Sequence, residues 1–365
     1  MSPVPYRTWC EIDESALHHN LAVIRARIGL HPKIMCLVKA DAYGHGLKAL
    51  SRFFQNSDCQ MLGCANVTEA LLIRKAKVRL PVLLLSAPLK MEMQEIVRNR
   101  FITTLSSLEE AEELGKVALR QKTRARCHIK LNTGMNRLGV DLENLLELLS
   151  QVQNDPSLKL EGFYSHYACA DSDPAFTRKQ WELFQGIQST GLCRHICNSA
   201  GLLALPESAA DMVRPGLAVY GLSTLKKYQK LFRPALSWKA RITFIRDVPR
   251  GTPLSYGATY KTPRRMKVAT VAAGYGDGLF RSLSNKGRVL VNGRICPILG
   301  RVTMDQILID ISRAGNVPNE SEVVLVGSQG RQTLLASDMA DEAGTIAYEI
   351  TCHITDRVPR LYRHG

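Results

Sequence analysis

A chain of 365 residues, 45% hydrophobic and 22% charged, is long enough for two domains with buried cores, and this composition excludes a largely disordered protein. The formal net charge of +15 invites a nucleic-acid-binding interpretation, but the tightest basic groups, at 261–267 and 357–363, are short and interrupted. We therefore expect no nucleic-acid partner, and a solvated basic surface that helps to attract carboxylate substrates.

The cysteines indicate a reducing compartment. All ten lack the spacing of a disulfide framework and form no C-x-x-C pair, so a cytoplasmic protein is expected. Cys193, His195 and Cys197 alternate like residues of a strand, which we favour over a metal site, and no metal is expected. Residues 1–13 lack the apolar core of a signal peptide, and no apolar run approaches the length of a membrane span.

The first 225 residues carry a repeating strand–helix rhythm. A strand pattern at 7–12 is followed by a helix that Asp13 would cap, with Leu17, Leu21 and Ile24 at helical spacing. Short apolar runs then alternate with amphipathic segments, and the runs cover 34–38, 61–64, 82–85, 101–104, 126–131, 160–163, 195–197 and 211–213. Eight such runs predict an α/β fold, a (β/α)8 TIM-type barrel, in preference to a doubly wound open sheet.

From about residue 226 the pattern changes to β-branched runs separated by glycine, at 241–247, 266–272, 288–291, 307–311 and 323–326, with one helical pattern at 334–343. We expect a barrel domain over 1–225 and a separate β-rich domain over 226–365, with residues 1–12 able to join either one.

Polar residues follow the predicted barrel strands, where the active site of such a barrel lies. They are Lys39, Lys130, Asn132, His166, Asn198, Ser199 and Arg214. Lys39 ends a buried strand, and burial would lower its pKa and make it a nucleophile that forms a Schiff base. A lysine that extends past the strand end to solvent is an equally good account of this stretch taken alone.

Several motifs resemble those of the alanine racemases, pyridoxal-phosphate (PLP) enzymes of fold type III, over essentially the whole chain. The matching stretches are Lys-Ala-Asp-Ala-Tyr-Gly-His-Gly at 39–46, His-Ile-Cys-Asn-Ser-Ala at 195–200, Val-Arg-Pro-Gly-Leu at 213–217, Leu-Ser-Tyr-Gly at 254–257 and Gly-Arg-Val-Thr-Met-Asp at 300–305.

The resemblance implies a two-base racemisation of L- and D-alanine that supplies D-alanine for peptidoglycan. Lys39 would hold PLP and act as the base on one face of the substrate Cα, and Tyr256 would act on the other face. A broad-specificity or serine-type racemase of the same fold is the alternative, because pocket volume is not readable from sequence.

The resemblance also assigns the remaining cofactor residues. Tyr43, Ser199, Gly216 and Leu217 would contact the phosphate, and Tyr348 would either contact the phosphate or narrow the entrance. Asn198 belongs to the same motif as Ser199, and His195 would brace Arg214 behind the pyridine nitrogen. Because arginine cannot accept a proton, the ring is a weaker electron sink, which favours racemisation over side reactions.

Arg137 and Met304 are implied as substrate-binding residues, with Lys130, His166, Tyr275 and Asp305 in support. The family often carbamylates the lysine matched by Lys130, but Asn132 replaces the usual aspartate and leaves carbamylation open. In the family Tyr256, Tyr275, Met304 and Asp305 reach the site from the partner subunit, so the resemblance implies a homodimer with two shared sites.

Overall fold

The computed structural model describes residues 5–187 and 191–364. Two compact units of chain make up the structure. The barrel unit is His18–Phe232, and the β unit combines Met1–Leu17 with Arg233–Gly365.

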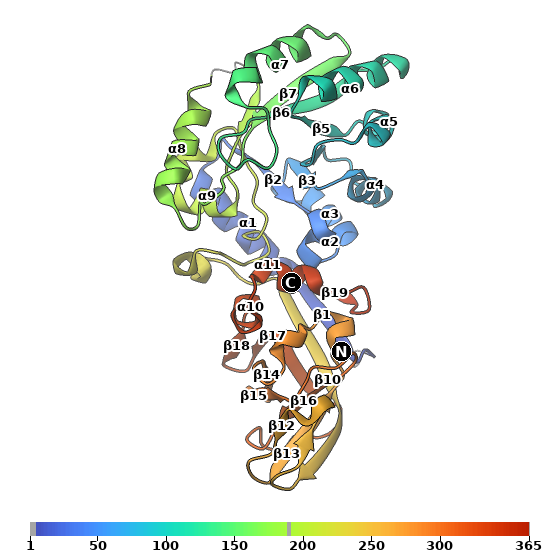
Figure 1. The fold of residues 1–365 in the computed structure, drawn as a ribbon, viewed down its shortest axis with the longest axis vertical. Helices are drawn as coiled ribbons and strands as arrows, with labels where there is room; N and C mark the ends of the chain where they lie inside the picture. The colour runs from blue at the N-terminus through green and yellow to red at the C-terminus, as the bar shows by residue number, and fades with distance from the viewer. Residues whose placement is uncertain (1–4, 188–190, 365) are drawn as a thin grey trace. The chain divides into compact units, whose positions relative to one another are not determined.

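The barrel unit contains an eight-stranded parallel sheet in the order β8-β7-β6-β5-β4-β3-β2-β9. Between β9 and β8, an isolated bridge joins Asn198 to Arg214, and the Asp211 amide donates to the Arg194 carbonyl at 3.0 Å, which completes the ring. Helices α4 to α8 lie outside the strands (Figure 1). The predicted TIM-type barrel is confirmed. Its strands are β2 Lys33–Leu37, β3 Met61–Cys64, β4 Val82–Leu84, β5 Ile102–Leu105, β6 Ala125–Lys130, β7 Leu158–Tyr164, β8 Cys193–His195 and β9 Met212–Val213.

One strand was predicted too late in the chain. The expected strand at 195–197 lies at Cys193–His195, because the chain must turn after His195 for Asn198 to cap the next helix. The Asn198 side chain accepts a hydrogen bond from the Gly201 amide at 2.8 Å, so residues 196 and 197 form the connection rather than the strand.

The β unit is built around the long strand β10, Leu236–Val248, which pairs with β1, β13 and β17. Strand β1, Thr8–Asp13, pairs antiparallel with β10 and parallel with β19, so this early segment lies in the sheet of the β unit. The predicted β-rich second domain is confirmed. The other strands are β11 Pro253–Leu254, β12 Tyr260–Lys261, β13 Met266–Val271, β14 Arg288–Val291, β15 Arg294–Leu299, β16 Ile307–Asp310, β17 Glu322–Gln329, β18 Gln332–Leu334 and β19 Arg360–Arg363.

The helices of the barrel unit follow the patterns seen in the sequence. In the described part of the β unit, one helix is present that the sequence did not predict. Besides the predicted α10, the short α11 carries Tyr348, and seven residues give too little periodicity to reveal it. The helices are α1 Glu14–Ile28, α2 Lys39–Gly44, α3 Leu47–Gln55, α4 Val67–Lys75, α5 Met93–Arg98, α6 Leu108–Arg120, α7 Leu142–Asn154, α8 Pro174–Gln185, α9 Ser199–Ala204, α10 Ala336–Ala343 and α11 Ala347–His353.

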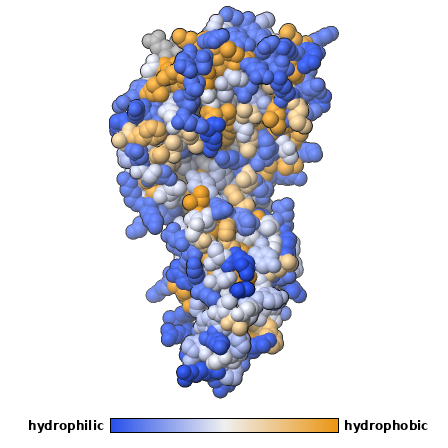
Figure 2. Space-filling model, viewed as in Figure 1, coloured by the Kyte–Doolittle hydropathy of each residue, from blue (hydrophilic) through white to orange (hydrophobic). Residues whose placement is uncertain are grey.

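Apolar side chains of the strands fill the interior of each unit. Ile34, Met35 and Cys36 of β2 are fully buried in the barrel unit, as are Trp238 and Ala240 of β10 in the β unit. The visible face of the barrel unit is mainly hydrophilic, with several hydrophobic patches (Figure 2). Each unit therefore has its own core.

Candidate active site

The predicted site residues of the barrel unit gather at the carboxyl ends of its strands. Lys39 follows β2, Lys130 ends β6, His166 follows β7, His195 ends β8 and Arg214 follows β9. Because all eight strands are parallel, these ends meet at one mouth of the barrel.

Lys39 begins a turn of left-handed helix. Ala40, Asp41, Ala42 and Tyr43 have φ values of 50°, 53°, 55° and 55°, a conformation that costs roughly 1–2 kcal/mol per residue for L-amino acids. Side-chain bonds hold it in place: Glu69 accepts from the Ala40 amide at 2.7 Å, and Asp41 accepts from the Leu47 amide at 2.7 Å. The turn leaves Lys39 half-buried and buries Tyr43.

Three predicted phosphate residues lie together. The Ser199 hydroxyl accepts hydrogen bonds from the amides of Gly216 at 2.9 Å and Ala218 at 3.2 Å. The Tyr43 hydroxyl occupies the space that a Cβ on Gly216 would need, so only glycine permits this approach. Backbone amides beside two hydroxyl groups form a cradle suited to an anion.

Arg214 is 1% exposed, and both terminal nitrogens of its guanidinium have hydrogen-bond acceptors. One nitrogen, Nη1, donates to His195 Nδ1 at 2.6 Å and to the His195 carbonyl at 2.9 Å. The other, Nη2, donates to the carbonyls of Ser165 and Ile196 at 2.6 and 3.0 Å and to His166 Nδ1 at 3.0 Å. A buried cation held by so many acceptors has a fixed position and direction.

The histidines around Arg214 are neutral. Burial, followed by the positive charge of Arg214, holds the pKa values of His166 and His195 well below 6.5. Because arginine only donates, both Nδ1 atoms are acceptors, and the proton of each neutral ring lies on Nε2. His166 Nε2–H is therefore available as a donor on the side away from Arg214.

Lys130 carries a weakened positive charge. Burial, followed by the nearby cations Arg214, Arg137 and Lys39 in that order, lowers its pKa to about 8. Its Nζ lies 5.5 Å from the centre of the Tyr164 ring. The same cations lower the pKa of His166, so positive charge dominates this mouth and favours an anionic ligand.

Asn132 organises the loop after β6. Its oxygen accepts from the amides of Gly134 and Asn136 at 3.1 and 3.0 Å, and its nitrogen donates to Asn136 at 2.8 Å and Asp141 at 2.7 Å. An aspartate here would lose both donated bonds and place its charge against Asp141. An asparagine at 132 therefore fits this loop better than an aspartate, because it both accepts and donates hydrogen bonds there.

In the β unit, a strained turn presents Tyr256. Ser255 has φ 60° and ψ −177°, and Gly257 and Ala258 also have positive φ values. The Ser255 hydroxyl donates to the Arg301 carbonyl at 2.7 Å and ties the turn to the loop that follows β15. Tyr256 is 74% exposed and borders a hollow of about 300 Å³ that Arg301 and Thr303 also line.

The other predicted residues of the β unit lie in loops that are bonded to one another. The amides of Tyr275 and Gly276 each donate at 2.9 Å, to the carbonyls of Thr303 and Met304. Asp305 pairs with Arg357 at 2.7 Å. Tyr275 is 42% and Met304 is 52% exposed, so this loop pair presents both side chains outward. Tyr348 belongs to a different element, α11.

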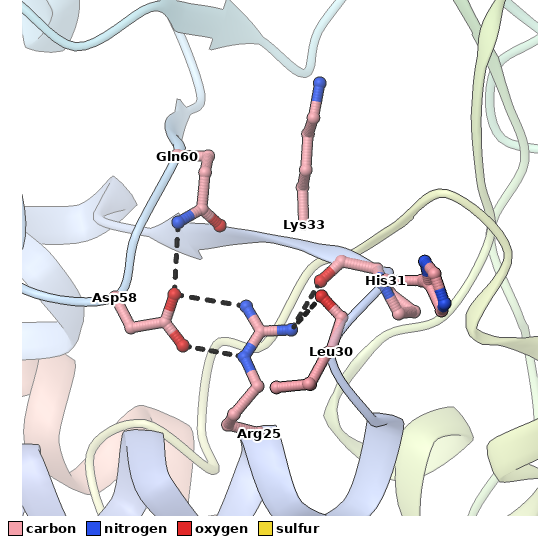
Figure 3. Close-up of a pocket in the computed structure, with 7 residues that line it drawn as sticks. Arg25, Leu30, His31, Lys33, Asp58 and Gln60 are labelled. Atoms are coloured by element: carbon pink, nitrogen blue, oxygen red, sulfur yellow. Dashed lines mark hydrogen bonds and ion pairs between the residues drawn. The ribbon is translucent and has the colours of Figure 1, made fainter.

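A second hollow lies at the opposite, amino-terminal end of the barrel strands, where residues 31–33 lead into β2. Arg25 binds Asp58 through two nitrogens at 2.7 and 3.1 Å and donates to the Pro32 carbonyl at 2.7 Å. Gln60 donates to the same carboxylate at 3.1 Å, while Lys33 points away from it (Figure 3). Because these polar groups bind one another, we interpret them as stabilising the amino-terminal end of the barrel rather than forming a ligand site.

Within the described parts of the chain, no group of three or more histidine, cysteine or acidic side chains is placed to hold a metal ion. The helices in those same parts are too short or too polar to cross a membrane.

Comparison with known proteins decides the family. Residues 12–224 match the model of the alanine racemase N-terminal domain, and residues 235–362 match that of the alanine racemase C-terminal domain. The chain belongs to the alanine racemase family. An alanine racemase of Halothermothrix orenii is 39% identical, with 98% of this chain and 97% of the relative covered.

Solved alanine racemases share the fold over the whole length. One from a Streptomyces lavendulae that produces D-cycloserine is 34% identical, with a TM-score of 0.91 and coverage of 100% and 98% of the two chains. One from Bacillus anthracis with bound L-Ala-P is 32% identical, with a TM-score of 0.91 and coverage of 100% and 97%. The likeness to these solved alanine racemases thus extends through both units of this chain.

The motifs of the alanine racemase family assigned no role to three residues in or just below the barrel mouth. Tyr164 stacks on His195 with ring centres 4.7 Å apart, Ser165 supplies a carbonyl to Arg214, and His128 contacts His195 at 3.0 Å. His128 lies two residues before Lys130, and strand periodicity alone would have placed both side chains on the same face of β6.

Proposed function

We propose that this enzyme interconverts L- and D-alanine with PLP as cofactor. The observation that carries the proposal is the convergence of Lys39, the buried Arg214 and the Ser199–Gly216 cradle at one barrel mouth. A primary amine, a fixed hydrogen-bond donor and an anion cradle are features suited to the aldehyde, the pyridine nitrogen and the phosphate of PLP.

The residues present fit the cofactor. Ser199 and Tyr43 would bind the phosphate, together with the amides of Gly216 and Leu217, and Lys39 would hold PLP covalently. Asn198 supports this cradle by capping α9. Tyr348 would add a phosphate contact. When bound, PLP supplies the electron withdrawal that weakens the Cα–H bond of the substrate.

Arg214 sets the electronic character of the site. It is a donor held by fixed acceptors, and even burial, which lowers its pKa to about 10, leaves it charged at neutral pH. His195 keeps it in place from behind. A charged donor facing the pyridine nitrogen offers no acceptor for a proton on that nitrogen, so the ring would be a weaker electron sink. The enzyme would therefore favour return of the substrate proton over competing reactions.

Two bases would move protons on opposite faces of the substrate. Lys39 would act on one face, and the partner subunit's Tyr256 on the other. His166, with its proton on Nε2, is a donor suited to stabilise the ionised tyrosine. The outward exposure of Tyr256, Tyr275 and Met304 supports a homodimer in which these side chains, with Asp305, complete the partner's site.

Arg137 and the Met304 amide would bind the substrate carboxylate. Lys130 would support Arg137, and its lowered pKa favours the neutral amine that reacts with carbon dioxide. Residue 132 is asparagine rather than the aspartate usual in the family. The lowered pKa of Lys130 is therefore the feature that supports carbamylation here.

We also propose a cytoplasmic enzyme that supplies D-alanine for peptidoglycan. All ten cysteines are free thiols, which suits a reducing compartment.

The deciding experiment uses the purified full chain supplied with PLP. We expect incubation with L-alanine to approach an equal mixture of enantiomers by chiral chromatography, and omission of PLP to abolish the conversion. L-serine and larger amino acids form the comparison panel. Faster conversion of L-serine than of L-alanine would replace the substrate assignment, while PLP binding without racemisation of any amino acid would overturn the proposed activity.

A further inference from the structure

His128 lies in the interior of the barrel unit, one layer below the mouth. It is 1% exposed, and its Nδ1 lies 3.0 Å from His195 Nε2. Burial lowers the pKa of His128 to about 4, so the ring is neutral near pH 7. Its position two residues before Lys130 puts both side chains on the interior face of β6.

The arrangement of protons around Arg214 follows from its chemistry. The guanidinium has donors alone, and it points one at His195 Nδ1 and one at His166 Nδ1. Both nitrogens must therefore carry lone pairs. A neutral His195 with an accepting Nδ1 must hold its proton on Nε2.

That Nε2 proton needs a buried acceptor. His195 is completely buried, and its Nε2 lies 3.0 Å from His128 Nδ1. His128 in turn must hold its own proton on Nε2, which leaves Nδ1 free to accept. The donors run in one direction, from Arg214 to His195 to His128.

We propose that His128 is a positioning residue that selects the tautomer of His195 and thereby supplies Arg214 with an accepting nitrogen. Without it, His195 either buries an unsatisfied N–H or moves the proton to Nδ1, where it meets the donors of Arg214. The inference rests on the proposed role of Arg214 toward the cofactor.

The neighbouring strand is shaped to hold this ring. Gly162 of β7 is paired with His128, and a Cβ on Gly162 would lie 2.5 to 2.7 Å from three atoms of the imidazole. A real Cβ cannot come so close, so glycine leaves the space that the ring fills. The ring is thereby held against His195.

The first test reads the protons directly and needs no cofactor. In PLP-free protein labelled with ¹⁵N-histidine, we expect two-bond ¹H–¹⁵N spectra at pH 7 to show His195 and His128 as neutral Nε2–H tautomers. His195→Gln assigns the His195 signals. An Nδ1–H tautomer of His195 in the unaltered protein would overturn the inference without any variant having to fold.

Two variants of His128 distinguish the effect of its accepting nitrogen from the effect of its side-chain volume. His128→Asn keeps an acceptor near the position of Nδ1, whereas His128→Leu removes it. Cys127→Ala, a buried change in the same strand outside the proposed machinery, is the control for a cavity. We expect the Leu variant to shift the His195 signals, while the Asn and Cys127→Ala proteins retain the Nε2–H pattern.

In the PLP-loaded enzyme, kcat for L-alanine should fall roughly 10- to 100-fold in His128→Leu, with KM changed less than about threefold, as expected for a buried donor left unsatisfied. His128→Asn should recover most of this loss. Equal kcat in the Leu variant and the unaltered enzyme would overturn the inference alone. Absence of racemisation in the unaltered enzyme would overturn the proposed function, while the cofactor-free spectra would still decide the tautomer.

Discussion

The barrel unit and the β unit present their site residues in opposite ways. In the barrel unit Arg214 is buried with both terminal nitrogens of its guanidinium hydrogen-bonded, and Ser199 and Tyr43 meet at Gly216. In the β unit Tyr256 and Met304 point outward from loops, 74% and 52% exposed. The comparison teaches that, apart from Tyr348, the proposed cofactor residues are held by bonds within one unit. The proposed second base, Tyr256, is exposed and acts only where a partner surface meets it.

Removing the amine should have the largest effect. We expect Lys39→Ala to lose covalent attachment of PLP and at least about 10⁴-fold in racemisation, because both the cofactor linkage and one base disappear. The measurements are borohydride trapping of PLP followed by mass spectrometry, and chiral chromatography. Retention of trapped PLP on the variant would mean that another amine holds the cofactor.

Tyr256→Phe should cost roughly 10²- to 10⁴-fold in racemisation while PLP stays bound, because only the base on the second face is lost. Unchanged racemisation by this variant would contradict the two-base assignment.

Mixing the two inactive variants sharpens the comparison between the units. In a hybrid dimer of Lys39→Ala and Tyr256→Phe chains, one site has both bases if Tyr256 acts in the partner. Random reassortment should then restore about a quarter of the unaltered activity. No recovery in mixtures shown by mass spectrometry to contain hybrids would mean that each chain uses its own tyrosine.

Acid should destabilise the barrel unit, because folding holds His128 in its neutral form. The pKa of His128 falls from 6.5 to about 4 on folding, so the unfolded chain binds more protons between these values. The free energy of unfolding therefore decreases as pH falls from 6.5 to 4, by about 3 kcal/mol from this group. Urea unfolding at several pH values measures the slope, and His128→Asn should flatten it; an unchanged slope would show that the ring is not held neutral.

The smallest expected effect concerns the loop after β6. Asn132→Asp should lower the free energy of unfolding by roughly 1–2 kcal/mol, because two donated hydrogen bonds are lost and a carboxylate faces Asp141. The double variant Asn132→Asp with Asp141→Asn restores a donor and should recover most of this loss in urea unfolding. A double variant that is less stable than the single one would show that the Asp141 contact is not the cause.

Sequence reasoning reached the strands of the barrel and most residues of its mouth for a clear reason. Apolar runs at regular spacing fix parallel strands, and residues that follow such strands must share one end, so Lys39 and Arg214 could be placed together from position alone. It was less successful where local periodicity is short. The strand of His195 was placed two residues late, and the seven-residue helix of Tyr348 was missed.

By itself, the sequence determined the barrel followed by a β-rich unit and the family, and it pointed to the side chains proposed to be chemically active, because these depend on local pattern and motif. The tertiary structure alone decided the left-handed turn at Ala40 to Tyr43, the set of acceptors around Arg214 and the place of His128 behind His195. Each of these features depends on a partner distant in sequence, such as Glu69 for the turn and Gly162 for the His128 ring. The hydrogen bonds and the space around a side chain are set only when the folded chain brings such partners together.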